Sequence, residues 1–219
     1  MKRRHFLTLS ATGLGSVLVY SLDNKTFSAV AQGQPVRIPL RFFTRTEALV
    51  VAAATARIVP SDDSGPGARE AGVAVYIDRQ LAGPYGRDRY RYTQEPFEDG
   101  VAELGYQGKA TPREIYREGL KSLGDFLHLE GAGQDLALTR IQTSLFFAML
   151  RQHTIEGMFC DPIHGGNKNL AGWKLIGFPG PRFSNLDDVD KHFGETFRPK
   201  ITTLREMAGH TLHPSEEER

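Results

Sequence analysis

The helical spacing of apolar residues most limits the fold of this chain, because alternating strand patterns are almost absent. Two segments begin with a Thr-x-x-Glu capping box, Thr44 with Glu47 and Thr111 with Glu114, whose side chains bond the free amides at a helix start. Apolar residues then recur three and four positions apart until proline or glycine intervenes. The sequence therefore predicts an all-α fold, a single helical domain of about five helices with a long loop-rich C-terminal segment.

The individual helices are placed by this spacing and by the residues that break it. The predicted helices run from Thr44 to Pro60, from Ala71 to Leu81, from Phe97 to Leu104, from Thr111 to Leu127 and, the longest, from about Leu138 to Met158. Beyond Pro179 the chain turns polar but keeps scattered large apolar residues, too many for a free linker. We expect this last segment to pack over its own domain or over a partner.

The N-terminal residues have the form of an export signal. Arg3 and Arg4 precede a weakly apolar run, Phe6 to Leu22, which resembles the twin-arginine pattern. The alternative is an uncleaved amphipathic anchor, but the run falls short of the roughly 20 residues of a spanning helix and Asp23 ends it, so we expect cleavage after Ala31. The predicted segments are a signal peptide at 1–31, a helical domain at 32–180 and a polar extension at 181–219. Export by the twin-arginine translocase implies a periplasmic location, or the outer face of the cytoplasmic membrane.

Charge and cysteine content exclude some classes of protein. Loss of residues 1–31 would remove four basic residues and one acidic residue from a chain of net charge +1, leaving a slightly acidic protein. Nucleic acid needs a basic face, so we expect no nucleic-acid partner. Cys160 is the only cysteine, which excludes a disulfide within the chain. It would either pair with another chain or lie buried as an inert thiol.

The segment from His153 to Gly180 is dense in glycine and in chemically versatile side chains, and a metal site is one interpretation. Four residues near the end of the longest predicted helix are of types that bind metal ions: His153, Glu156, Asp161 and His164. They lack a recognised ligand spacing such as H-E-x-x-H. A free-standing periplasmic enzyme or metal-binding protein using these four residues is therefore the alternative interpretation of the chain.

A catalytic or phosphate-binding site is supported less well. A nucleophilic site would pair Cys160, Ser144 or Ser184 with a histidine and an acid, but no nucleophile elbow is present. The glycine pair before Asn167 could approach a phosphate, yet the known glycine-rich motifs follow a strand and none precedes this one. We therefore predict no catalytic, cofactor-binding or metal-binding residue in this chain.

Docking to another protein accounts for more of the segment. Its glycines permit tight or left-handed backbone, and its aromatic residues are of the kind that dominate interfaces. The predicted partner-binding residues are Phe159, Asp161, Asn167, Trp173, Ile176 and Phe178. Of these, Asp161 and Asn167 should hold the loop shape through hydrogen bonds to nearby backbone. We expect Trp173→Ala to leave the isolated domain folded and to weaken association by on the order of 2 kcal/mol or more.

The run TIEGMFCDPIHGGNKNLAGWKLIGFPG, Thr154 to Gly180, resembles the signature of the gluconate 2-dehydrogenase subunit 3 family, T-x-x-G-x-F-x-D-P-x-Y-G-G-N-x-x-x-x-G-W-x-x-I-G-F-P-G. The agreement includes Asp161, Asn167 and Trp173, and the resemblance extends back to about Phe42. His164 replaces the usual tyrosine, Cys160 stands where a small polar residue is common, and the tail beyond Gly180 does not map onto the family.

The resemblance implies a small subunit without a cofactor of its own. In this family the large subunit is a flavin dehydrogenase of the glucose-methanol-choline type, which carries FAD and oxidises a sugar, polyol or sugar acid. A multihaem cytochrome c subunit often takes the electrons. Similarity also implies that the small subunit lends its export signal to the large subunit and supports its maturation and stability.

Overall fold

The computed structural model describes residues 17–22, 25–30, 39–91, 95, 97 and 100–212. The chain divides into two compact units, Met1–Pro39 and Leu40–Arg219. In the first, strands β1 (Val17–Leu22) and β2 (Lys25–Val30) pair antiparallel. Arg3, Arg4 and the expected cleavage site at Ala31 lie outside the described residues. None of the helices described in the structure has the length and apolar character needed to cross a membrane.

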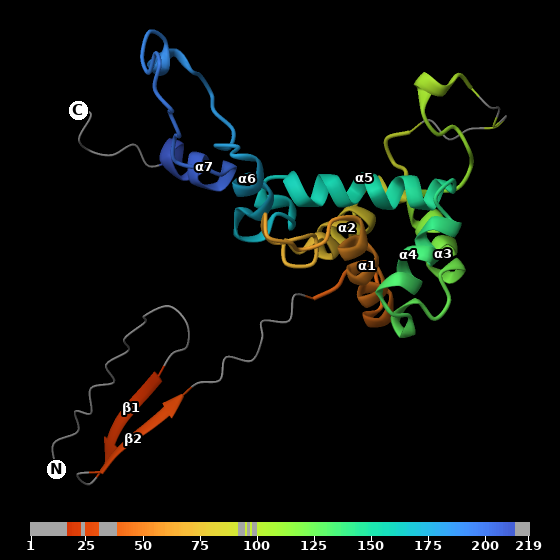
Figure 1. Ribbon diagram of the computed structural model, residues 1–219, viewed down its shortest axis with the longest axis horizontal. Helices are drawn as coiled ribbons and strands as arrows, with labels where there is room; N and C mark the ends of the chain where they lie inside the picture. Colours follow the sequence, from red (N-terminus) through yellow and green to blue (C-terminus); the bar gives the residue numbers. More distant parts are fainter. Residues whose placement is uncertain are drawn as a thin grey trace. The chain divides into compact units, whose positions relative to one another are not determined.

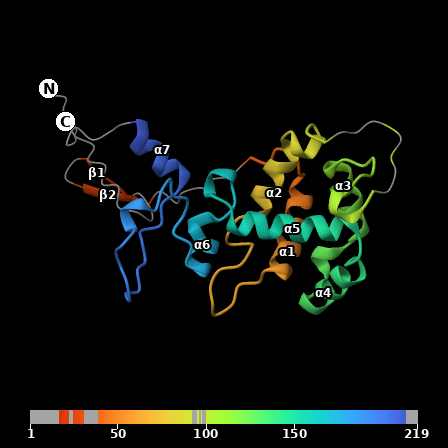
Figure 2. The same ribbon diagram turned by 90° about the horizontal axis from the view of Figure 1, so that it is seen from above.

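The second unit is helical, which confirms the predicted all-α class. Its described residues form seven α-helices: α1 (Arg45–Ile58), α2 (Val73–Ala82), α3 (Pro112–Ser122), α4 (Gly131–Arg140), α5 (Leu145–Phe159), α6 (Ala171–Ile176) and α7 (Leu204–Leu212). Helix α5 is central and contacts α1, α2, α3 and α6. It runs from α3 and α4 at one end to α6 at the other (Figures 1 and 2).

Both predicted capping boxes are present. The Thr44 hydroxyl accepts the Glu47 amide at the start of α1, and the Glu47 carboxylate accepts the Thr44 amide in return. Thr111 and Glu114 form the same pair of bonds at the start of α3. These local bonds fix where the two helices begin, and for that reason the sequence predicts them well.

Two predicted helices are corrected by the structure. The long helix expected from about Leu138 to Met158 is two helices, because the Ser144 hydroxyl accepts the Phe147 amide and starts α5 anew. The helix expected from Phe97 to Leu104 is wrong: its described residues hold only the short 3-10 helix Ala102–Leu104, and Leu104 is exposed. The apolar spacing there does not correspond to a buried face.

The core forms where α1, α2, α3 and α5 meet. Large side chains with no exposure come from these helices and from the 3-10 helix Phe126–His128 after α3; they include Val51, Ile77, Leu81, Tyr116, Phe126 and Leu150. Helices α3 and α5 approach closely at Gly119, where an added Cβ would lie 2.0 Å from Cγ of Phe146. Because Gly119 has no side chain, the two helices can pack this closely.

Asp78 connects the residues before α1 to α2, and Arg113 connects α3 to α2. The buried carboxylate of Asp78, on α2, accepts the backbone amides of Arg41, Phe42 and Phe43 at 2.8, 3.0 and 2.8 Å. Arg113, on α3, donates to the carbonyls of Leu81 and Ala82 at the C-terminal end of α2. A cation at that end also complements the helix dipole.

Residues 181–203 form an arm that leaves the helices and returns to them (Figures 1 and 2). The base is closed by the Thr202 amide, which donates to the Pro179 carbonyl at 3.0 Å. The Leu204 amide then donates to Oδ2 of Asp161 at 2.8 Å as α7 begins. The expected packing over the chain's own domain is thus present at the base of the arm, whereas Phe183 and Phe193 on the arm are exposed.

Candidate docking surface

A loop follows the end of α5, and Asp161 stabilises it. Its Oδ1 accepts the Ile163 amide at 2.9 Å, which caps the 3-10 helix Pro162–His164, while Oδ2 accepts the Leu204 amide at 2.8 Å. One carboxylate therefore fixes the turn after α5 and the start of α7. This is the loop-holding role that the sequence predicted for Asp161.

Asn167 holds the next part of the loop and is fully buried. Its side chain donates to the Cys160 carbonyl at 2.8 Å and accepts the Gly172 amide at 2.9 Å, and its own amide donates to the Gly157 carbonyl at 2.8 Å. The backbone at Asn167 is left-handed, with φ 46°. Its neighbour Gly166 approaches α5 so closely that an added Cβ would lie 2.1 Å from the Gly157 carbonyl oxygen.

Trp173 packs inside its own chain. It is 3% exposed, donates its indole N–H to the Phe159 carbonyl at 2.7 Å, and meets the ring of Phe178 edge-on at 5.1 Å. This corrects the expectation that Trp173 is a surface anchor whose removal leaves the domain folded. Its indole instead connects α6 to the end of α5, where Phe159 is half-buried.

Asn167 and Trp173 support a small exposed patch of apolar side chains. Leu175 and Ile176, the last two residues of α6, are exposed, as is Phe178 two positions further on; Ile176 is 59% exposed. We call these three residues the α6 patch. Their positions follow from the buried bonds of Asn167 and Trp173, which orient the short helix. Ile176 and Phe178 thus remain candidate partner-binding residues, as the sequence predicts.

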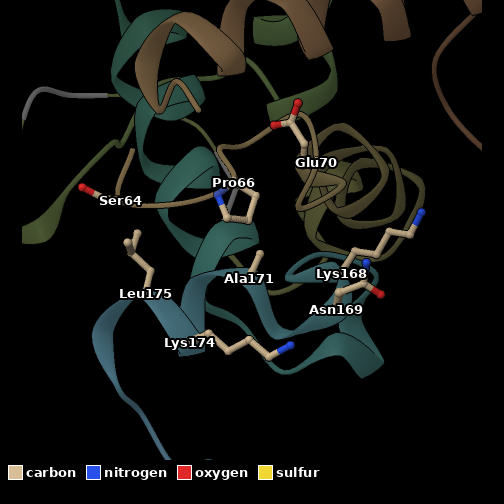
Figure 3. A pocket seen from close by; sticks show the side chains of 8 residues that line it. All are labelled: Ser64, Pro66, Glu70, Lys168, Asn169, Ala171, Lys174 and Leu175. Atoms are coloured by element: carbon tan, nitrogen blue, oxygen red, sulfur yellow. The ribbon is translucent and has the colours of Figure 1, made fainter. Parts of the chain in front are cut away.

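A hollow of about 310 Å³ adjoins the α6 patch, between residues 64–70 and residues 168–175. Figure 3 shows Ser64 and Leu175 on one side of it and Lys168 and Asn169 on the other. Asn169 and Leu170 both have left-handed backbone, at φ 58° and 59°. This conformation costs free energy in residues other than glycine. The contacts of Asn167 and of α6 must therefore hold it in place.

The four candidate metal ligands have separate roles. Both ring nitrogens of His153 bond tyrosines, Tyr85 at Nε2 and Tyr116 at Nδ1, each at 2.8 Å. Glu156 accepts from Tyr76, Asp161 binds backbone amides, and His164 is exposed. Within the part of the chain that the structure describes, no group of three or more histidine, cysteine, aspartate or glutamate side chains is arranged to hold a metal ion. The structure therefore does not assemble the metal site of the alternative interpretation.

Burial favours the neutral form of each member of the histidine network. Burial lowers the pKa of His153, and the nearby charge of Glu156 opposes this lowering only in part. Burial, followed by the charges of Glu156 and Asp88, raises the pKa of Tyr85 to about 12. Burial likewise raises the pKa of Tyr116 well above its usual value. A neutral imidazole has one donor and one acceptor nitrogen, so one tyrosine accepts from His153 and the other donates to it.

The candidate nucleophiles have structural contacts. Burial raises the pKa of Cys160 to about 11, so its sulfur stays a thiol near neutral pH. The Ser144 hydroxyl caps α5, and the Ser184 hydroxyl accepts the Leu186 amide at 3.0 Å. Tyr76, Tyr85 and Tyr116 were missed by sequence reasoning, because nothing local in the sequence connects them with a histidine on α5.

Comparison with known proteins gives one match. The model of the family described as gluconate 2-dehydrogenase subunit 3 matches residues 45–180, which include α1 to α6 and the α6 patch. The arm and α7 lie outside the matched range. The searches of curated proteins and of solved structures returned no match.

Proposed function

The chain belongs to the gluconate 2-dehydrogenase subunit 3 family, as a small subunit of a dehydrogenase complex, and from this premise we propose that it is a non-catalytic subunit. Its partner is a large subunit that carries FAD and oxidises a sugar, polyol or sugar acid. In the complex, the α6 patch contacts that subunit, and a multihaem cytochrome c subunit accepts the electrons.

One observation carries the proposal. From His153 to Asn167, four polar side chains that could perform chemistry, those of His153, Glu156, Asp161 and Asn167, are engaged inside the chain, whereas His164 is exposed. The neighbouring α6 patch is apolar and exposed. Apolar and aromatic side chains at the centre of a patch are what protein interfaces bury. This arrangement suits a binding subunit better than an enzyme.

The export part of the proposal rests on Arg3 and Arg4 in the N-terminal sequence. Proteins that follow the twin-arginine route cross the membrane already folded, so a small subunit with this signal would carry a folded, FAD-loaded partner with it. We propose that the complex works in the periplasm or on the outer face of the cytoplasmic membrane, and that this chain supports maturation of the large subunit.

The proposal is tested by expressing this chain with and without the large-subunit gene and measuring dye-linked sugar oxidation in the periplasmic fraction. Activity should require both chains and should disappear with Arg3→Lys/Arg4→Lys, while Lys2→Arg, which also keeps the charge, should have no effect. Substrate oxidation by the purified small subunit alone, or a stoichiometric metal bound to it, would contradict the proposal.

A further inference from the structure

A groove runs between α2 and α5, formed by two adjoining hollows of about 460 and 550 Å³. Both hollows are lined by Tyr76, Gln80 and Glu156. The first continues along α5 past Met149, and the second continues past Phe159. The groove therefore follows the crevice between the two helices, with one carboxylate near its middle.

The carboxylate of Glu156 is held in place in this groove. Its Oε2 accepts from the hydroxyl of Tyr76 at 2.9 Å, and its Oε1 accepts from the side-chain amide of Gln152 at 3.0 Å. Leu145 and Ile155 on α5 are exposed beside the same two hollows. A fixed anionic group between apolar side chains is thus open to solvent on one side.

Glu156 has no cation partner within the described part of the chain. The ion pairs there join other acids to a base, for example Glu47 to Arg117 and Asp135 to Arg57. The neighbouring His153 and Tyr85 bond each other at 2.8 Å and not Glu156, and burial shifts the pKa of each towards its neutral form. A half-buried carboxylate without a counter-ion favours a cationic ligand.

We infer that this groove receives a segment of the large dehydrogenase subunit whose lysine or arginine pairs with Glu156. Apolar side chains of that segment would pack against Leu145, Met149 and Phe159, and the rings of Tyr76 and Tyr85 would add cation–π attraction to the incoming charge. The pairing excludes water around the cation and so fixes the register of the segment in the groove. This inference rests on the proposed function.

The test compares binding of purified wild-type and Glu156→Gln small subunits to the purified FAD-bearing large subunit, at low and at raised NaCl. Glutamine keeps an oxygen that can accept from Tyr76, and far-UV circular dichroism with a melting curve checks that the variant folds. We expect Kd to rise about tenfold or more at low salt, and the salt dependence of Kd to shrink. Glu118→Gln, whose carboxylate is exposed beside Lys121 on α3, should bind as wild type.

This experiment gives different results if the groove inference is wrong and if the proposed function is wrong. If the wild-type subunit does not bind the large subunit, the proposed function is wrong and the groove inference goes with it. If the wild type binds and folded Glu156→Gln binds equally well at both salt concentrations, only the groove inference is overturned.

A second measurement does not depend on a loss of binding. p-Benzoylphenylalanine placed at Met149 in the groove should crosslink to the large subunit on irradiation, and the same group at exposed Leu136 on α4 should not. Crosslinks from Met149 only to a second copy of this chain, or only from Leu136 to the large subunit, would overturn the groove as its docking site.

Discussion

At the scale of single residues, buried polar side chains connect distant parts of the chain. Asp78 and Asn167 are both buried, and each bonds several backbone groups. Among the described residues, no buried side-chain nitrogen or oxygen is left without a hydrogen-bond partner. Loss of one such side chain leaves several buried backbone groups without a hydrogen-bond partner. The free energy of unfolding should therefore fall by more than the contribution of one ordinary hydrogen bond.

Asp78→Ala is expected to lower the free energy of unfolding by about 3 kcal/mol or more, because it leaves the amides of residues 41–43 without an acceptor. Urea unfolding followed by circular dichroism measures this loss. Asp135→Ala is the matched control, since Asp135 is exposed and pairs with Arg57 at the surface. It should change the free energy of unfolding much less, because ion pairs between exposed side chains stabilise little. Similar costs for both variants would contradict the role assigned to Asp78.

His153 should make stability depend on pH below neutrality. Burial lowers its pKa in the folded state, so as the pH falls the unfolded chain takes up the proton first, near its pKa of about 6.5. Above that pH, His153 makes its full contribution to the free energy of unfolding. This contribution is lost as the pH falls towards the pKa of the folded state. His153→Gln should remove this pH dependence, which amounts to a slope in the free energy of unfolding of at most about 1.4 kcal/mol per pH unit.

Urea unfolding of the wild type and of His153→Gln at several pH values between about 7.5 and 5.5 measures the two slopes. Gln142→Asn, an exposed change in the turn before α5, serves as a control and should keep the wild-type slope. A wild-type slope that persists in His153→Gln would show that another group is responsible.

At the scale of elements, helix starts follow from local chemistry and helix spacing follows from contacts between helices. Ser144 divides the predicted long helix with one side-chain bond. Gly119 sets how closely α3 approaches α5, because Phe146 occupies the space where a side chain would be. The first effect is local in the sequence, whereas the second appears only when the two helices pack.

Gly119→Ala is expected to destabilise the protein by about 1–3 kcal/mol through overpacking against Phe146, even though alanine is the better helix former. Gly209→Ala, in α7, is the matched control because an added Cβ there meets nothing within 4 Å. Thermal unfolding should show a lower Tm for the first variant and an unchanged or higher Tm for the second. Equal stabilisation by both changes would show that α3 and α5 can move apart freely.

At the scale of the whole molecule, residues that support the candidate docking surface differ from residues that form it. Trp173 is buried and fastens α6 to α5, whereas Ile176 stands exposed in the α6 patch. The family match includes both. Substitutions at the two positions should therefore separate effects on folding from effects on binding.

Ile176→Ser should leave the melting temperature unchanged and weaken binding to the large subunit about tenfold, or about 1.4 kcal/mol, because an exposed apolar contact is removed. Trp173→Ala should instead lower the free energy of unfolding by about 3–5 kcal/mol. Leu136→Ser, an exposed change on α4, controls for general surface effects. Unchanged affinity of folded Ile176→Ser would remove the α6 patch from the interface.

Much of the fold could be predicted from the sequence, but only part of the candidate site. Capping boxes at Thr44 and Thr111 predict α1 and α3, since each box lies within four consecutive residues. The expected loop bonds of Asp161 and Asn167 are also present. The spacing of apolar residues does not show whether Trp173 faces inward, and it predicted a helix around Leu104 where the side chain is exposed.

The sequence by itself determined the helical class, two helix starts and membership of the family, because these depend on neighbouring residues or on a contiguous signature. Tertiary structure alone decided that His153 bonds Tyr85 and Tyr116, that Trp173 is buried, and that Glu156 lies in a groove with no counter-ion among the described residues. The histidine contacts join residues 37 and 68 positions apart. Packing, which follows from the burial of apolar surface over the whole domain, brings them together.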